Sequence, residues 1–373
     1  MVWLSSGVSL VGTGPFVRID TGTGPGRFGR AESGFRAHFA RADVADEVDE
    51  PGTGPLCFGS WTFDENRPGS VVLVPSVVYG ASESAAWETR IDCAGSPAFD
   101  PSSVPPPGAQ GGLEDWISRF ERVYEQIKQG RVQKVVLARA IRAAAGADRP
   151  EVLRRLAVRY PGCFTFACRG LVGASPELLV RRVGNVVDSI PIAGSAPRGA
   201  DEQADEEIGR QLWASEKNRL EHRLTVESVI DALRPCCAEL EAEAEPSLLL
   251  LENLQHLSTK VQGRLEGTPS SLQLAGMLHP TAAVCGTPRA GALNLIRSVE
   301  GFDRGRYAGP VGWMDRQGDG EWAIALRCAD LSVDPPLVYA GAGIVEGSSA
   351  EEEFEETELK LQAMVSALGA GPL

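Results

Sequence analysis

Residues 339–360, YAGAGIVEGSSAEEEFEETELK, set the pattern for the rest of the chain. A β-prone run enters a glycine loop, and a helix leaves the loop. Ser348 and Ser349 are candidate N-caps for this helix, because a serine hydroxyl can accept a hydrogen bond from a free backbone N–H of the first turn. The first turn is acidic, which suits the positive end of the helix dipole. The stretch therefore predicts a strand, a tight loop and an amphipathic helix.

Two carboxylates and a lysine share one side of this predicted helix. At about 100° per residue, Glu353, Glu356 and Lys360 lie next to an apolar stripe that continues to Leu368. Two interpretations remain open from this segment alone. The acids form a solvated helix start, or they hold a hard cation whose bound anion then meets Lys360. Three further glutamates are predicted to face water: Glu351, Glu355 and Glu358.

The composition is typical of a soluble globular protein. The chain has 373 residues, 43% of them apolar and 23% charged, which is enough for one large or two ordinary domains. No apolar run is long enough to cross a membrane, and the N-terminus has no signal-peptide pattern. The net charge of −14 argues against a nucleic-acid or anionic-membrane partner, so an anionic substrate would need a locally basic pocket. We expect a cytoplasmic protein that is a monomer or a weak dimer.

The eight cysteines show no C-x-x-C pair and no regular spacing. Several lie inside apolar runs, as in CFTFAC at 163–168. Buried free thiols in a cytosolic enzyme are therefore predicted. A zinc site is not predicted, because the four histidines are scattered as well.

Proline and glycine divide the chain into regions. Residues 101–112 form the clearest connector, between an N-terminal β-rich layer over 1–100 and a main region over 113–373. Residues 21–30 are rich in glycine but lack the lysine–serine pair of a phosphate-binding loop. They are predicted to form an ordinary loop.

Hydrophobic periodicity predicts the helices and strands. Helices are expected over 113–127, 150–160, 203–233, 270–278 and 289–299. Strands are expected over 58–64, 71–75, 132–141, 163–169, 177–188, 309–315, 321–331 and 337–340, and residues 248–265 are expected to be extended. The short turn at 317–320 indicates antiparallel pairing. Runs of strands interrupted by groups of helices indicate an α+β fold.

Two titratable residues stand in or beside predicted strands. Lys134 is either a snorkelling edge residue or a buried amine, which burial would make usable as a general base near neutral pH. Glu177 precedes an apolar strand and either pairs with Arg181 or, if it is partly buried, has a raised pKa and donates a proton. The local sequence does not choose between these interpretations.

Other polar residues lie further along the main region. Glu221 follows Lys217 by four residues and forms either a surface ion pair with it or a carboxylate site with Glu356 that suits Mg²⁺. His256 is a lone histidine, which is usually structural. Arg327 is a charge in an apolar strand, so it needs an anion that comes from the protein or from a substrate.

Taken together and in this order, these segments resemble the chorismate-utilising enzymes, the family of isochorismate, salicylate, anthranilate and aminodeoxychorismate synthases. The resemblance covers roughly residues 113–368 and is specific as a set. The segments are KVVLAR at 134–139, GASPELL at 173–179, PIAGS at 191–195, the helix with Glu221 and His222, HPT at 279–281, CGTP at 285–288, residues 312–328, and GAGIV at 341–345 through to Lys360. The resemblance implies an α+β fold in which large antiparallel sheets pack face to face and helices lie outside.

The same resemblance implies the parts of a chorismate site. Mg²⁺ would hold a substrate carboxylate, with Glu221 and Glu356 as ligands and Glu353 helping. A metal would also reverse the local sign of this acidic protein for a dianionic substrate. Arg327 and Lys360 would meet substrate carboxylates. Gly194, Ser195, Tyr307 and Gly341 would line the pocket, and the approach of the nucleophile would be bordered by His256, Ala283 and Val284.

Lys134 selects a subgroup within the family that the sequence resembles. Members that add water need a base at this position, whereas members that add ammonia usually have a residue such as glutamine. The resemblance implies that Lys134 deprotonates water for attack at ring carbon C2 of chorismate and that Glu177 protonates the departing C4 hydroxyl. The product is then isochorismate, and no glutaminase partner is expected.

Four alternatives stay open. Salicylate synthase uses the same site and goes on to eliminate pyruvate, and no residue here separates it from isochorismate synthase. An ammonia-dependent synthase subunit is disfavoured by Lys134. A non-catalytic chorismate- or metal-binding protein would need neither Lys134 nor Glu177. A nucleotide-binding oxidoreductase is disfavoured because the glycines of 341–347 do not fit G-x-G-x-x-G.

Overall fold

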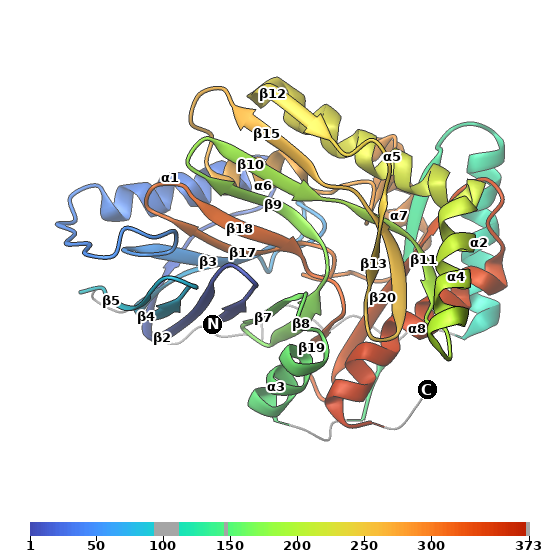
Figure 1. Cartoon of the computed structure of the whole chain (residues 1–373), viewed down its shortest axis with the longest axis horizontal. Helices are drawn as coiled ribbons and strands as arrows, with labels where there is room; N and C mark the ends of the chain where they lie inside the picture. Colours follow the sequence, from blue (N-terminus) through green and yellow to red (C-terminus); the bar gives the residue numbers. More distant parts are fainter. Residues whose placement is uncertain (93–111, 145–147, 371–373) are drawn as a thin grey trace.

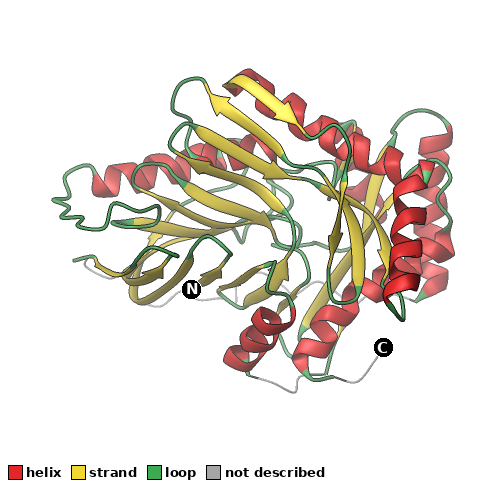
Figure 2. Cartoon of the chain, viewed as in Figure 1, coloured by secondary structure: helices red, strands yellow, loops and turns green. Residues whose placement is uncertain are grey.

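Helices cover the outside of a large antiparallel sheet in the computed structural model, which describes residues 1–92, 112–144 and 148–370 (Figures 1 and 2). The predicted α+β class, with antiparallel sheets and helices outside, is therefore confirmed. Most of the predicted connector over 101–112 lies outside the described residues, and so does Cys93.

The strands of the described residues are short to medium in length. In chain order they are β1 (Val2–Leu4), β2 (Ser9–Ile19), β3 (Leu56–Ser60), β4 (Val71–Ala81), β5 (Ala86–Arg90), β6 (Lys134–Arg142), β7 (Phe164–Cys168), β8 (Leu171–Ser175), β9 (Leu178–Val183), β10 (Val186–Ile190), β11 (Ile192–Pro197), β12 (Cys237–Ala242), β13 (Ser247–Leu250), β14 (Leu254–Ser258), β15 (Val261–Leu265), β16 (Gly286–Thr287), β17 (Pro310–Asp315), β18 (Gly320–Ile324), β19 (Cys328–Asp330) and β20 (Leu337–Ile344).

The helices mostly follow the predicted periodicity. They are α1 (Arg27–Phe39), α2 (Leu113–Lys128), α3 (Arg149–Arg159), α4 (Glu202–Ala214), α5 (Glu216–Leu233), the 3-10 turn η2 (Arg234–Cys236), α6 (Ser271–Leu278), α7 (Arg289–Val299) and α8 (Ala350–Leu368).

The strands belong to two separate sheets. One has 17 strands, and the other has three, in the order β11–β14–β13. The turn at 317–320 joins β17 to β18 as an antiparallel pair, as predicted. β20 pairs along its whole length with residues 135–142 of β6, which places Ala342 opposite Leu137 and Gly343 opposite Val136. This register brings the glycine-rich strand alongside the strand that begins with Lys134.

The predicted loop over 21–30 is wrong at its end, because α1 begins at Arg27. The helix buries Phe28, Ala31, Phe35 and Phe39 on one face. These residues are spaced as one helical stripe, but two glycines and four charged or histidine residues lie between them and obscure the pattern in the sequence.

Three predicted elements are interrupted. The strand over 177–188 divides at a turn over 184–185 into β9 and β10, which pair antiparallel. The helix over 203–233 divides at Ser215, which adopts an extended conformation and caps α5 by accepting a hydrogen bond from the Asn218 N–H. The strand over 321–331 divides at Arg327, whose φ of 46° lies in the left-handed region and cannot continue a strand.

The helix of the opening stretch, α8, forms largely as predicted. Ser349 is its N-cap and accepts a hydrogen bond from the Glu352 N–H. The indole N–H of Trp116 on α2 donates to the Ala350 carbonyl at 2.9 Å, which fastens the first turn to the body of the protein. Of the glutamates expected to face water, Glu351 and Glu355 are exposed. Glu358 is not, because it forms an ion pair with Arg139 on β6.

The seven described cysteines are all free, as expected. Five are buried, whereas Cys236 and Cys237 are partly exposed. No helix in the described parts of the chain combines the length and the apolar character that crossing a membrane requires.

We expect Leu361→Ala to lower the free energy of unfolding by about 2–5 kcal/mol. Leu361 has no exposed surface and belongs to a buried cluster with Val152, Leu156 and Met364, so its removal leaves a cavity between α8 and α3. Urea unfolding measures the change. The matched control is Val158→Ala on α3, where the side chain is 68% exposed and the expected change is within about 0.5 kcal/mol. An equal loss in both variants would contradict this packing.

Candidate active site

A cavity of about 50 Å³ lies among residues from β6, β11, β14, β20, α5 and α8. Glu177 and Glu221 line it, and so do all nine predicted pocket residues: Gly194, Ser195, His256, Ala283, Val284, Tyr307, Arg327, Gly341 and Lys360. Lys134, Glu353 and Glu356 are not among the lining residues. Lys134 pairs with Glu221, Glu356 pairs with Lys360, and Glu353 pairs with Lys217, as described below.

Lys134 is completely buried at the start of β6. Its Nζ donates to the Thr225 hydroxyl at 2.9 Å and lies 3.1 Å from Oε1 of Glu221. Glu221 and Thr225 are four residues apart on α5, so they present one face to the lysine. The interpretation of Lys134 as a snorkelling edge residue is therefore wrong. Although burial opposes ionisation of Glu221, the charges of Lys134 and Lys360 lower the pKa of its carboxyl, which stays ionised.

Gly343 makes room for this ion pair and was not singled out by the sequence analysis. A Cβ at position 343 would lie 2.0 Å from Oε1 of Glu221 and 3.0 Å from Cε of Lys134. No side chain fits in that space. The signal in the sequence was the alternation of glycine and alanine at 341–343, which keeps one face of β20 free of bulk.

Glu177 lies between β8 and β9 and is 3% exposed. The Ile192 N–H is its backbone donor, at a long 3.5 Å. Burial raises the pKa of Glu177 to about 8, against the lowering effects of this hydrogen bond and of the Lys134 and Arg327 charges. The group therefore carries a proton at neutral pH and can donate it. The alternative pairing with Arg181 does not occur, because Arg181 pairs with Asp188.

Arg327 is held by a histidine rather than by a carboxylate. Its Nη2 donates to Nε2 of His256 at 3.0 Å, and Nδ1 of His256 lies 3.2 Å from the Gly194 carbonyl. Burial, followed by the charges of Arg327 and Lys360, keeps the pKa of His256 well below its usual range. The ring is therefore neutral, with its proton on Nδ1. Within the described residues no carboxylate forms an ion pair with Arg327, so its charge faces the cavity.

Lys360 supplies a second cationic group to the cavity. Its Nζ donates to the Gly341 carbonyl at 2.9 Å and pairs with Glu356 one helical turn earlier on α8. The predicted closeness of Glu356 and Lys360 is therefore observed. The cavity thus combines two positive groups, Arg327 and Lys360, with a protonated acid, Glu177.

The three candidate metal ligands each have a lysine partner. The pairs are Lys134 with Glu221, Lys217 with Glu353, and Lys360 with Glu356. In the described parts of the chain, no group of three His, Cys, Asp or Glu side chains converges as a metal site would. Each carboxylate is directed to its lysine instead.

The negative charges of the other two carboxylates nevertheless act on Glu353. Burial first, and then the charges of Glu356 and Glu221, raise its pKa to about 7 even though Lys217 opposes the shift. Lys217 therefore pairs across to α8, and the expected surface ion pair with Glu221 on its own helix is wrong. The three acids form one electrostatic cluster at the edge of the cavity.

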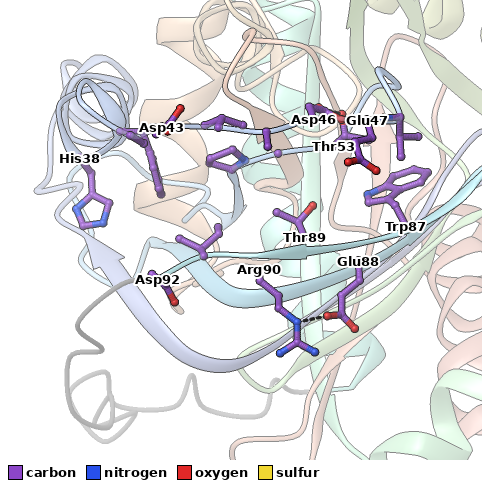
Figure 3. Close-up of a pocket in the computed structure, with 18 of the residues that line it drawn as sticks. His38, Asp43, Asp46, Glu47, Thr53, Trp87, Glu88, Thr89, Arg90 and Asp92 are labelled. Atoms are coloured by element: carbon purple, nitrogen blue, oxygen red, sulfur yellow. Dashed lines mark hydrogen bonds and ion pairs between the residues drawn. The ribbon is translucent and has the colours of Figure 1, made fainter.

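A larger cavity of about 750 Å³ lies elsewhere, between the end of α1, residues 41–55 and β5 (Figure 3). Its lining mixes acidic side chains such as Asp46 and Glu88 with His38, Arg90 and Trp87. None of the predicted site residues lies there. The chemistry that the sequence indicates therefore belongs to the smaller cavity.

Comparisons with known proteins identify the family of the chain. Residues 97–369 match the family described as chorismate binding enzyme. The isochorismate synthase DhbC of Bacillus subtilis is 38% identical over 84% of this chain and 81% of its own. The isochorismate synthase EntC of Escherichia coli strain K12 is 35% identical over 97% and 92%. The solved structure of MenF, the menaquinone-specific isochorismate synthase of Escherichia coli, superposes with a TM-score of 0.78 at 25% identity, covering 98% of this chain and 87% of that one. The chain therefore belongs to the chorismate-binding enzyme family.

Proposed function

We propose that this protein is an isochorismate synthase, which isomerises chorismate by adding water at C2 and releasing the C4 hydroxyl. The observation that carries the proposal is a fully buried lysine, Lys134, paired with a glutamate that lines the cavity, Glu221, together with a protonated carboxyl group, Glu177, in the cavity wall. The names of DhbC, EntC and MenF support the same activity.

The two positive groups of the cavity suit a dianionic substrate. Arg327 offers a guanidinium that is preorganised by His256 and that has no described carboxylate partner, and a guanidinium binds a carboxylate in a fork. Lys360 offers an ammonium from α8. Together they would fix the two carboxylates of chorismate, which places the ring between Lys134 and Glu177.

The reaction needs one proton acceptor and one proton donor. Lys134 pairs with Glu221 as an ammonium in the resting site, so it would first lose that proton. The resulting amine would then take a proton from water while the water oxygen bonds to C2. The ring double bonds shift, the C4–O bond breaks, and Glu177 gives its proton to the leaving oxygen, which departs as water. One water enters and one leaves, so the reaction is an isomerisation. Exchange with solvent then restores both side chains.

We propose Mg²⁺ as the cofactor, with Glu221 and Glu356 as ligands and Glu353 assisting. Carboxylate oxygens are the donors that Mg²⁺ takes. Burial, followed by the charges of Glu356 and Glu221, raises the pKa of Glu353, and a bound divalent cation would offset both effects. When bound, the metal would neutralise a substrate carboxylate. No glutaminase partner is proposed, because water is the nucleophile.

Product analysis tests the activity. We expect the purified protein to convert chorismate to isochorismate alone when Mg²⁺ is present, as measured by chromatography of the quenched reaction. Salicylate with an equal amount of pyruvate would instead identify a salicylate synthase. A product that forms only after ammonia is added would exclude water addition.

Lys134→Gln tests the proposed base. Glutamine keeps a hydrogen-bond donor for Glu221 and Thr225 but cannot accept the proton of water, so we expect turnover to fall about 10²–10⁴-fold. Calorimetric titration should show that chorismate still binds within a few-fold of the wild-type affinity. The control is Lys128→Gln, which removes an exposed lysine paired with Glu125 on α2 and should leave turnover unchanged. Full activity in Lys134→Gln would eliminate Lys134 as the base.

Glu177→Gln tests whether the proposed acid is protonated. The pKa of Glu177 is about 8 in the folded state and 4.5 in the ordinary carboxyl. The folded state therefore holds the proton more tightly, and this stabilisation is complete below pH 4.5 and is lost as the pH rises through 8. We expect the stability of the wild type relative to Glu177→Gln to fall between these values in urea unfolding. A difference that does not change with pH would show that the carboxyl is ionised.

A further inference from the structure

A buried ion pair outside the cavity holds the main chain of residues that line it. The side chains of Arg304 and Glu300 are 2% and 1% exposed, and neither residue lines the cavity. Nε of Arg304 donates to Oε2 of Glu300 at 2.8 Å, and its Nη2 pairs with the second carboxylate oxygen. Although burial lowers it, the charge of Glu300 raises the pKa of Arg304, which stays charged.

Other N–H groups of Arg304 donate to two main-chain carbonyls. Nη2 donates to the Val136 carbonyl on β6 at 2.8 Å, and Nη1 donates to the Val284 carbonyl at 2.7 Å. The carbonyl of Arg304 in turn accepts the Tyr307 N–H at 3.0 Å. These three partners, Val136, Val284 and Tyr307, all line the cavity. One arginine therefore connects three parts of the cavity wall.

The ion pair also completes one edge of β6, the strand that begins with Lys134. Within the described residues, β16 pairs with only the first two residues of this strand. Further along the same edge, Arg304 binds the Val136 carbonyl, and Glu300 accepts the Ala138 N–H at 2.8 Å. Val136 and Ala138 are buried, so their main-chain groups need partners. Two side chains supply these partners where the ladder ends.

The guanidinium of Arg304 gives direction rather than net stability. A buried ion pair is often no more favourable than apolar side chains of similar volume. A guanidinium, however, fixes the angles of several N–H donors in one planar fork, which an ammonium does not. The ring centroid of Phe63 lies 4.1 Å from Cζ of Arg304, so the guanidinium also packs on an aromatic face. Its orientation is therefore set from several sides.

Arg304 holds the part of the cavity wall that lies beside the proposed base. The segment that follows Val284 runs along β6, with Thr287 opposite Lys134. The two cationic groups proposed to hold the substrate come from other elements, because Arg327 precedes β19 and Lys360 belongs to α8. A shift of the segments that Arg304 holds would therefore move the base relative to a substrate whose carboxylates stay anchored.

We propose that Arg304, oriented by Glu300, is a positioning residue for the reaction. It sets the place of β6, and with it Lys134, against the neighbouring wall segment at Val284. This inference deepens the proposed function and rests on it. It predicts that a change at Arg304 affects turnover much more than substrate binding.

Arg304→Lys tests this split between turnover and binding. Lysine keeps the charge beside Glu300 but lacks the fork, so it cannot hold the Val136 and Val284 carbonyls in the same geometry. We expect kcat to fall about 10²-fold, as a displacement of about 1 Å can cause, while KM for chorismate stays within about threefold of the wild type. Initial rates measure both constants, and circular dichroism at the assay temperature checks that the variant is folded.

Glu300→Gln is the second variant. Glutamine keeps the size of the side chain and an acceptor for the Ala138 N–H, but it offers Arg304 one oxygen in place of two. We expect a smaller fall in kcat, about tenfold, again with KM nearly unchanged.

The matched control is Arg182→Lys. Arg182 is also buried, pairs with Asp319 and donates to the Gln317 carbonyl, but none of these three residues lines the cavity. We expect this variant to be less stable and to keep its kcat. An equal fall of kcat in the control, or an unchanged kcat in either folded variant of the ion pair, would overturn the inference and leave the proposed function standing. A wild type that does not convert chorismate to isochorismate would overturn the proposed function, and the inference with it.

Discussion

A charged amine without any contact with solvent governs the architecture around the cavity. Lys134 is fully buried within the large sheet, and an ammonium there is tolerated only if it is paired and hydrogen-bonded. Glu221 and Thr225 satisfy it from a single face of α5, which fixes how that helix is rotated against β6. The neighbouring strand must then lack a side chain at Gly343. One buried charge therefore determines the rotation of α5 against β6 and requires a glycine at position 343 of the neighbouring strand β20.

Local periodicity predicted the parts of the site that lie within one element. Glu356 and Lys360 are neighbours because residues four apart on any helix are neighbours, and the fold class followed from the order of strands and helices. The pairing of Lys217 was missed for the same reason. Spacing along α5 favoured Glu221, but tertiary packing places α8 closer, and a buried carboxylate there attracts the lysine more strongly.

One of the remaining errors also reflects a long-range contact. Glu358 appeared solvent-facing from the helix pattern, yet Arg139 arrives from β6 and pairs with it. The helix α1 was hidden because glycines and charges separate its buried aromatic residues. Arg327 is buried, as predicted, but its partner in the structure is His256 and not a carboxylate. No strand pattern could show that its backbone turns to the left-handed region there. Of these features, the pairing of Glu358 depends on a partner distant in the chain, whereas the other two are local conformations that the hydrophobic pattern does not reveal.

The separation of the two sheets has a further consequence for how a substrate enters. β11 and β14, which carry Gly194, Ser195 and His256, belong to the three-stranded sheet and form one wall of the cavity. Among the described strands, no ladder hydrogen bond joins this wall to the larger sheet, so an outward movement of the wall would break none. The hydrogen bond between Arg327 and His256 joins this wall to the segment that leads into β19 of the larger sheet. An outward movement of the wall formed by β11 and β14 would thus also break the contact between His256 and Arg327.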